Sequence, residues 1–273
     1  MVEKLFSFYP PTYSLKDFTY AFSSANRHFK LLLIVAGITF FLGYMEYVYS
    51  FMLIRREKSA PYPVWMHTFY FAHDSMGAIV FAVASKAVGG FCFFDLASVA
   101  LVVWNCFEVY NLYKCIFVER QAIWGHLYDQ PVKIKDAFLR VLGQIIVFVG
   151  VVNLFRVFMD DPYMFKWFIF TNILIAIVPG LYWEKRKTQI GASYKLAIVI
   201  LIGTINSFLH WNKWALTSNY FSVSNNPWFY ILGIIATGFA IRNILVLRRM
   251  KKKPKRLSNG TKTVFNIRNK TIN

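Results

Sequence analysis

Residues 29–53 read FKLLLIVAGITFFLGYMEYVYSFML, and Lys30 and Glu46 are the only charged residues in this stretch. A helix needs about 20 mostly apolar residues to cross roughly 30 Å of hydrocarbon, because it rises about 1.5 Å per residue. The stretch is long and apolar enough to do so. It therefore predicts a helix that spans a membrane.

Six further apolar runs follow, bounded by charged or turn-forming residues. Together the seven runs cover residues 29–53, 65–85, 91–117, 138–158, 163–183, 196–216 and 227–247. Of the 273 residues, 57% are hydrophobic and 16% are charged, whereas soluble domains carry about 25% charged residues. This pattern predicts an all-α, polytopic membrane protein built as a bundle of seven transmembrane helices.

The Lys and Arg residues divide unequally between the two ends of the predicted bundle. Twenty-one lie on the side that includes the chain's basic end, eight lie on the other side, and the remaining two fall inside spans. Cytoplasmic loops carry the excess of positive charge in membrane proteins. We therefore expect an extracytoplasmic N-terminal segment (1–28), a transmembrane domain (29–247) and a basic cytoplasmic tail (248–273).

The formal net charge of +18 is concentrated in this tail, which holds ten of the 31 Lys and Arg residues. A polar, basic segment of this kind is expected to be disordered and to contact anionic lipid headgroups. No nucleic-acid-binding motif accompanies the charge, so nucleic acid is not expected as a partner.

Four carboxylates lie in the predicted spans: Glu46, Asp74, Asp95 and Glu108. Ionisable groups inside a bilayer are costly, and each is by default a functional hypothesis. Asp95 lies near the outer end of its run, but the other three sit roughly 12 to 16 Å from the predicted cytoplasmic end at helical rise. We expect these three to line one cavity. The alternative is that each acid only bridges neighbouring helices.

Polar and aromatic residues accompany these acids at helical spacing. The candidate substrate-binding residues are Tyr47, His67, Tyr70, His73, Trp104 and Asn105. Aromatic faces stabilise a desolvated cation by about 1 to 2 kcal/mol each, and a carboxyl group buried in such surroundings is expected to keep its proton. This combination suits the protonation of an alkene or epoxide and the guidance of the resulting carbocation.

No motif indicates a metal or a cofactor. The five histidines (His28, His67, His73, His126 and His210) form no HxxxH or HExxH pair. The chain also carries no GxSxG, P-loop or Rossmann fingerprint. We therefore expect neither a metal ion nor a bound cofactor.

Several short pieces of the chain carry a family resemblance. They are GYMEYVY (43–49), SAPY (59–62), AHD (72–74), WGH (124–126), GASY (191–194) and NP (226–227). In this order, and at these places relative to the spans, they resemble the integral-membrane terpene cyclases of fungal meroterpenoid and indole-diterpene pathways. The resemblance implies a seven-span enzyme and makes this chain a divergent member.

The resemblance also bears on individual residues. The family's essential acid ends an Asn-x-x-Trp-Glu motif, and Asp74 stands where that glutamate would, with Tyr70 for the Asn and His73 for the Trp. The family carries a second acid in the last span, where this chain offers only Arg242 and Asn243. Arg242 is expected either to neutralise one of the buried acids or to extend toward the inner surface.

The sequence therefore favours a membrane-bound cyclase of a linear, lipid-soluble isoprenoid, of isomerase or lyase type. Asp74 is the expected general acid, and Glu108 and Glu46 are expected to tune or replenish its proton. Tyr47, Tyr70 and Trp104 would line the path of the cation. Two alternatives remain: a transporter or ligand-binding protein that uses the same acids, and a scaffold subunit that works through its basic tail.

Overall fold

The computed structural model describes residues 12–258 and 260–264, and within these ranges its regular elements are helices. The long helices are α3 (Phe29–Glu57), α4 (Val64–Ala87), α5 (Cys92–Phe117), α7 (Ile134–Phe158), α8 (Phe165–Arg186), α9 (Tyr194–Phe208) and α11 (Pro227–Arg249). The short helices are α2 (Leu15–Ala21), α6 (Arg120–Trp124) and α10 (Lys213–Thr217). This confirms the predicted all-helical class.

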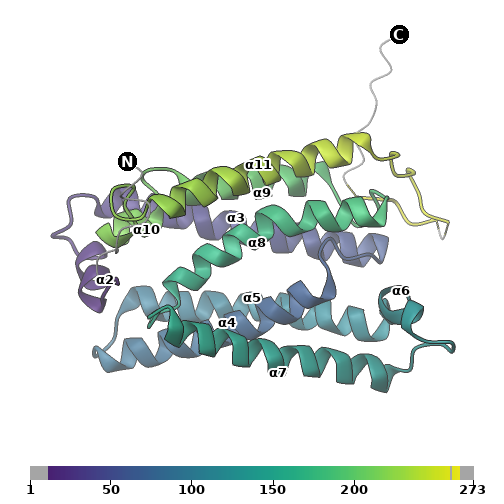
Figure 1. The fold of residues 1–273 in the computed structure, drawn as a ribbon, viewed down its shortest axis with the longest axis horizontal. Coiled ribbons are helices and arrows are strands. Elements are labelled where there is room, and N and C mark those ends of the chain that lie inside the picture. Colours follow the sequence, from purple (N-terminus) through teal and green to yellow (C-terminus); the bar gives the residue numbers. More distant parts are fainter. Residues whose placement is uncertain (1–11, 259, 265–273) are drawn as a thin grey trace, which may run out of the picture.

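The long helices run side by side in two groups (Figure 1). One group consists of α4, α5 and α7, and the other of α3, α8, α9 and α11. Contacts between α3 and α5 join the two groups. Side chains from both groups therefore meet along a seam in the middle of the molecule.

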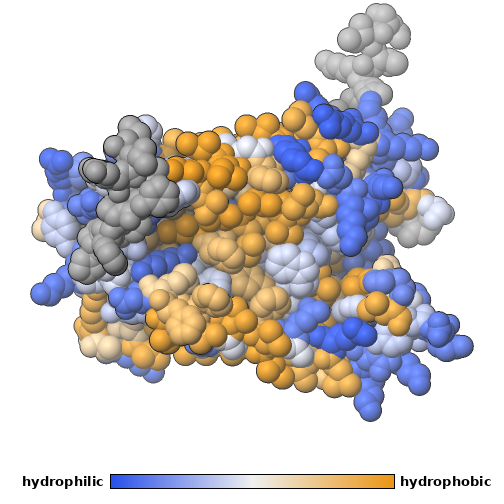
Figure 2. Space-filling view, viewed as in Figure 1, coloured by the Kyte–Doolittle hydropathy of each residue, from blue (hydrophilic) through white to orange (hydrophobic). Residues whose placement is uncertain are grey.

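Six helices in the described part of the chain are long and apolar enough to cross a membrane. They are α3, α5, α7, α8, α11 and the segment Tyr194–Thr217, which comprises α9 and α10. On the face that Figure 2 shows, hydrophobic residues cover the middle of the molecule and hydrophilic residues gather toward both ends. The structure thus indicates a multi-pass membrane protein. The helix α4 is comparably long but is not among the six, because His67, His73 and Asp74 lower its mean hydropathy.

The predicted run 196–216 is not one continuous helix. It divides at residues 209–212, where the Asn212 side chain accepts a hydrogen bond of 2.9 Å from the Ala215 N–H. An Asn side chain in this position caps a new helix by satisfying one of its free N–H groups. The chain therefore turns after α9 and starts α10.

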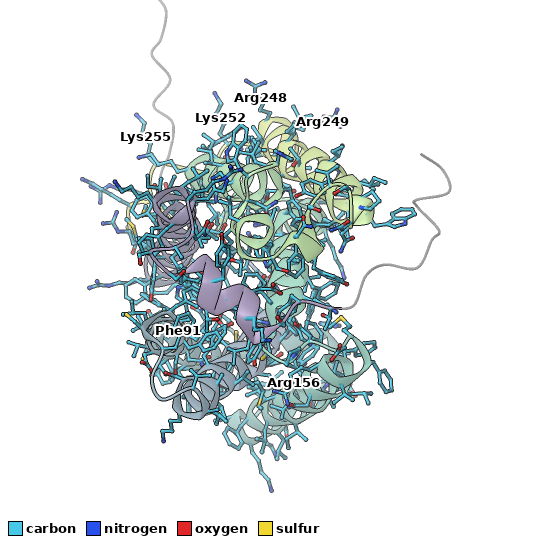
Figure 3. The ribbon with its side chains drawn as sticks, turned by 90° about the vertical axis from the view of Figure 1, so that its left-hand side faces the viewer. Phe91, Arg156, Arg248, Arg249, Lys252 and Lys255 are labelled. Atoms are coloured by element: carbon cyan, nitrogen blue, oxygen red, sulfur yellow. The ribbon has the colours of Figure 1, made fainter. Side chains whose placement is uncertain are left out.

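The N-terminal part of the described chain crosses the same end of the bundle as α10. Helix α2 lies over the ends of the long helices, as the end-on view shows (Figure 3). The Tyr13 hydroxyl donates a hydrogen bond to Asp161, whose carboxylate also accepts the N–H groups of Lys166 and Trp167 at 3.0 and 2.9 Å. Asp161 therefore ties the N-terminal segment to the first turn of α8.

At the opposite end, part of the predicted disordered tail packs against the bundle. Lys253 Nζ donates to Glu57 Oε1 at 2.7 Å and to the Ala192 carbonyl at 2.8 Å. The Val264 N–H donates to the same Glu57 oxygen at 2.7 Å. In the structure the buried Glu57 carboxylate thus binds two groups of this part of the tail. Disorder of the tail stays a prediction, and its residues 265–273 lie outside the described residues. Other tail cations, among them Lys252 and Lys255, point away from the bundle (Figure 3).

Candidate functional site

A cavity of about 770 Å³, including the space at its mouth, lies between the two groups of helices. Residues of α3, α4, α5, α8, α9 and α10 line it, together with Tyr62 of the connection between α3 and α4. Its polar lining includes Thr39, Glu46, Tyr47, Tyr62, Tyr70, Asp74, Glu108, Thr171, Asn172, Ser207 and Lys213. We call it the acid-lined cavity.

The three acids expected at one depth do line this cavity together. Glu46 comes from α3, Asp74 from α4 and Glu108 from α5, so three consecutive helices each contribute one carboxyl group. Asp95 does not line the cavity and is exposed near the start of α5. Asp95, which the sequence places near the end of its apolar run, is therefore the one of the four acids that lies outside the cavity.

Two of the acids are paired with histidines. His73 Nδ1 lies 2.8 Å from Asp74 Oδ1, and His67 Nδ1 lies 2.8 Å from Glu108 Oε2. Both histidines are fully buried and neither lines the cavity. They were expected to touch a substrate, but they lie behind the acids. Each pair is neutral while it holds one shared proton and negative after releasing it.

The third acid is different. Glu46 forms no hydrogen bond or ion pair with any other residue that the structure describes. Gly203 of α9 lies close to it, since an added Cβ at Gly203 would be 3.5 Å from Glu46 Oε1. The carboxyl group of Glu46 is therefore free to interact with a molecule in the cavity.

Aromatic side chains form the walls around these groups. The rings of Tyr47 and Trp104 stack with their centroids 5.9 Å apart, and the Tyr47 hydroxyl lies 3.4 Å from Asp74 Oδ2. The Tyr70 hydroxyl donates to the Thr171 carbonyl at 2.9 Å, which fixes its ring in the wall. Gly43 makes room for Trp104, since a Cβ there would come within 3.0 Å of the indole ring.

Asn105, the remaining candidate substrate-binding residue, does not line the cavity. Its side-chain amide lies 3.2 Å from the Ser75 hydroxyl of α4. Asn105 therefore bridges α4 and α5, as polar residues between membrane helices commonly do.

Lys213 is a lining residue that the sequence did not suggest. It opens α10, and its ammonium group lies 4.5 Å from the Trp214 ring centroid and 5.2 Å from that of Phe40. Such contacts stabilise a cation through the ring quadrupole. The only available signal was that this lysine interrupts the apolar run 196–216. The cavity consequently has carboxyl groups on three helices and an ammonium group at the start of α10.

Arg242 neutralises none of the cavity acids. Its guanidinium donates to the Glu184 carboxylate of α8, and both side chains are partly exposed, at 34% and 55%. In the part of the chain that the structure describes, no group of three or more His, Cys, Asp and Glu residues is placed to hold a metal ion.

Comparisons of the chain with protein-family models, curated proteins and solved structures find no match.

Proposed function

We propose that the chain is a membrane-bound cyclase of linear isoprenoids, in which a carboxyl group of the acid-lined cavity protonates an alkene or epoxide. The observation that carries the proposal is the meeting of three carboxyl groups on one aromatic-lined cavity, two of them backed by histidines. A lipid-soluble substrate would enter from the bilayer, and the reaction needs no metal or cofactor.

The proposal includes α4 as a seventh span, with the N-terminus outside and the tail in the cytoplasm. The helix α4 packs between α5 and α7, both of which are apolar enough to span. Its polar residues His67, His73 and Asp74 are 0%, 0% and 2% exposed, so they face the bundle instead of lipid. Outward-pointing tail cations would contact anionic headgroups on the cytoplasmic side.

Asp74 is the proposed general acid. Its proton forms a new C–H bond with a terminal alkene carbon, or an O–H bond with an epoxide oxygen as the C–O bond breaks. The π electrons of the next double bonds then form the ring bonds. The faces of Tyr47, Tyr70 and Trp104 stabilise the moving positive charge, and the Asp74–His73 pair, now negative, does the same.

The other two acids close the cycle. The final cation loses a proton to a base, and Glu108 with His67 is suited to accept it because the pair is neutral after protonation. Glu46, which no other described residue engages, accepts that proton from the Glu108–His67 pair and passes it to Asp74, so that all three groups return to their starting state. In this scheme Glu46 and Glu108 take the part of the second acid that the last span lacks.

A transporter or ligand-binding protein is the second candidate. The observation in its favour is a second pocket, at the inner end of the molecule, that shares Tyr62 with the acid-lined cavity. Two compartments that meet at one side chain resemble a path through the membrane. Substrate flux into proteoliposomes that depends on Glu46 or Glu108 would favour this function.

The test of the cyclase is product formation. Membranes containing the chain are incubated with linear prenyl substrates and their epoxides, and cyclic products are followed by mass spectrometry. General acid catalysis contributes about 10²- to 10⁴-fold, so Asp74→Asn is expected to lower the rate by at least about 100-fold. Asp95→Asn is the matched control, because it makes the same change at an acid outside the cavity. Full activity in Asp74→Asn would remove this mechanism.

A further inference from the structure

A second pocket lies at the inner end of the molecule, near the end of α8 and beside α6, on the right of Figure 1. It measures about 1640 Å³, including the space at its mouth. The lining of this pocket includes Lys58, Trp65, Glu119, Leu181, Lys185 and Arg186. We call it the basic pocket.

Arg186 is held in the pocket by one end of its guanidinium group. Nη1 donates to Ser59 Oγ at 2.9 Å and to the Ala60 carbonyl at 2.8 Å. The other two nitrogens, Nε and Nη2, are buried and have no hydrogen-bond partner among the residues that the structure describes. The guanidinium carbon lies 5.0 Å from the centroid of the Tyr182 ring. The Nε and Nη2 N–H groups point from one edge of the guanidinium plane, the edge that binds two oxygens of a phosphate or carboxylate at once. Arg186 therefore presents an edge that suits an anion.

Glu119, in the turn between α5 and α6, lines the same pocket. Its Oε1 is buried without a hydrogen-bond partner, and its Oε2 accepts only the Ala60 N–H, at 3.4 Å. Burial raises the pKa of the Glu119 carboxyl above its ordinary value. No ion pair within 4.0 Å joins it to Arg186. A group between the two must accept from Arg186 and share a proton with Glu119, as a phosphate oxygen and a P–OH group do.

The rest of the pocket fits the remainder of an amphiphile. Lys58 and Lys185 add positive charge at its rim. Trp65 and Leu181 line it with side chains that are 37% and 44% exposed. A phosphate at Arg186 would therefore place an attached hydrocarbon chain along this apolar surface.

We infer that the basic pocket binds an anionic, phosphate-bearing amphiphile, with its phosphate on the free edge of Arg186 and its chain along Trp65 and Leu181. The two sources of such a group are an anionic phospholipid of the membrane and a prenyl phosphate. The inference does not depend on the chemistry of the acid-lined cavity.

The test uses the full chain purified in detergent. Its thermal unfolding is followed with dioleoyl phosphatidic acid, dioleoyl phosphatidylcholine, farnesyl monophosphate and inorganic phosphate. A ligand that binds the folded state raises the unfolding temperature, so we expect a rise with phosphatidic acid, with farnesyl monophosphate or with both. A rise with the first alone assigns a membrane lipid, and a rise with the second alone assigns a prenyl phosphate. The inference would be overturned if phosphatidic acid and phosphatidylcholine raised the unfolding temperature equally and farnesyl monophosphate did not raise it. It would also be overturned if inorganic phosphate alone raised the unfolding temperature as much as the amphiphiles do.

Variants then place the ligand. Arg186→Lys keeps the charge but loses the two-pronged edge, so binding should weaken at least about tenfold. Arg56→Lys makes the same change at an exposed arginine of the same end that does not line the pocket, and it should bind as the wild type does. Glu119→Gln keeps an acceptor oxygen in the pocket and should also bind. Wild-type affinity in Arg186→Lys would contradict the inference. If Arg186→Lys does not fold, native mass spectrometry of the purified wild type is the test. The inference then requires that the protein retain an anionic, phosphate-bearing amphiphile from the membrane.

Discussion

Glu46 and Glu57 are the same residue type on the same helix, about three turns apart, and their surroundings are opposite. The Glu57 carboxylate is 3% exposed and accepts hydrogen bonds from the Gly191 N–H, Lys253 Nζ and the Val264 N–H, each at 2.7 Å. Glu46 faces a cavity and has no partner among the described residues. A buried acid whose oxygens are all engaged stabilises the fold, whereas an acid with none engaged is available for chemistry.

The two acids therefore have different expected roles. Glu57 joins α3 to the tail and to the turn before α9, and no substrate can reach its engaged oxygens. Glu46 contributes little to folding, and its carboxyl group is available for proton transfer to a molecule bound in the cavity. The same substitution should therefore have different effects at Glu46 and at Glu57.

The largest expected effect is on stability at Glu57. Glu57→Gln removes one partner of a buried ion pair and leaves the Lys253 charge uncompensated, which costs about 3 to 5 kcal/mol. Thermal unfolding in detergent measures it. Glu46→Gln is the matched control and should unfold at the wild-type temperature or above. A Glu46→Gln variant that is as unstable as Glu57→Gln would erase the distinction.

A smaller effect is the coupling between Glu57 and Lys253. Lys253→Met alone should also destabilise the protein, because it leaves the Glu57 carboxylate without its cation. The double variant Glu57→Gln/Lys253→Met should lose less than the two single losses added together, by about 1 to 3 kcal/mol. A double-mutant cycle on unfolding free energies measures this difference. Strict additivity would mean that the pair does not hold the tail.

Glu119 lies between the two extremes, because one of its oxygens is engaged and the other is not. Burial raises the pKa of its carboxyl, so the folded state binds this proton more tightly than the unfolded state. Glu119 therefore destabilises the fold above its folded pKa, and the cost disappears as the pH falls below its ordinary value of about 4.3.

Replacing the Glu119 carboxyl by an uncharged amide should remove this cost. Glu119→Gln should unfold at a higher temperature than the wild type near pH 7, and the difference should shrink as the pH is lowered toward 4. The comparison is made in the absence of added amphiphile. A difference that grows on acidification would contradict the assignment.

The smallest expected effect is at Tyr47. Its hydroxyl lies 3.4 Å from Asp74 Oδ2, which is long for a hydrogen bond. Tyr47→Phe should therefore slow cyclic product formation by only about twofold to threefold, the lower end of what one hydrogen bond contributes. Tyr44→Phe is the control, since its hydroxyl donates to the Ala100 carbonyl outside the cavity. A 100-fold loss would make Tyr47 itself the proton donor.

Much of the helical layout could be predicted from the sequence. Six of the seven apolar runs each overlap one long helix, and the run 196–216 is divided between α9 and α10. Helix α3 starts at Phe29 and α5 ends at Phe117, as predicted. Membrane helices are long and continuously apolar, so composition alone locates them. The break after α9 was missed because it depends on one capping side chain, Asn212, inside an otherwise apolar run.

The candidate site could be predicted only in part. Helical spacing and depth placed Glu46, Asp74 and Glu108 on one cavity. The pairing of His67 with Glu108 was out of reach, because it joins residues 41 positions apart on different helices. The partners of Glu57 could not be predicted either, because they lie 134, 196 and 207 positions away in the sequence. Sequence spacing reports neighbours on one helix, and these contacts are made between distant segments.

The most direct test of the central claim follows the proton itself. A linear prenyl alkene is cyclised by the wild type in D₂O, and the product is analysed by mass spectrometry and NMR. Protonation by an exchangeable carboxyl group predicts one deuterium at the carbon that is protonated first, and product formation at least about 100-fold slower in Asp74→Asn. Cyclic product that carries no deuterium at carbon, or that forms at the wild-type rate in Asp74→Asn, would contradict the account.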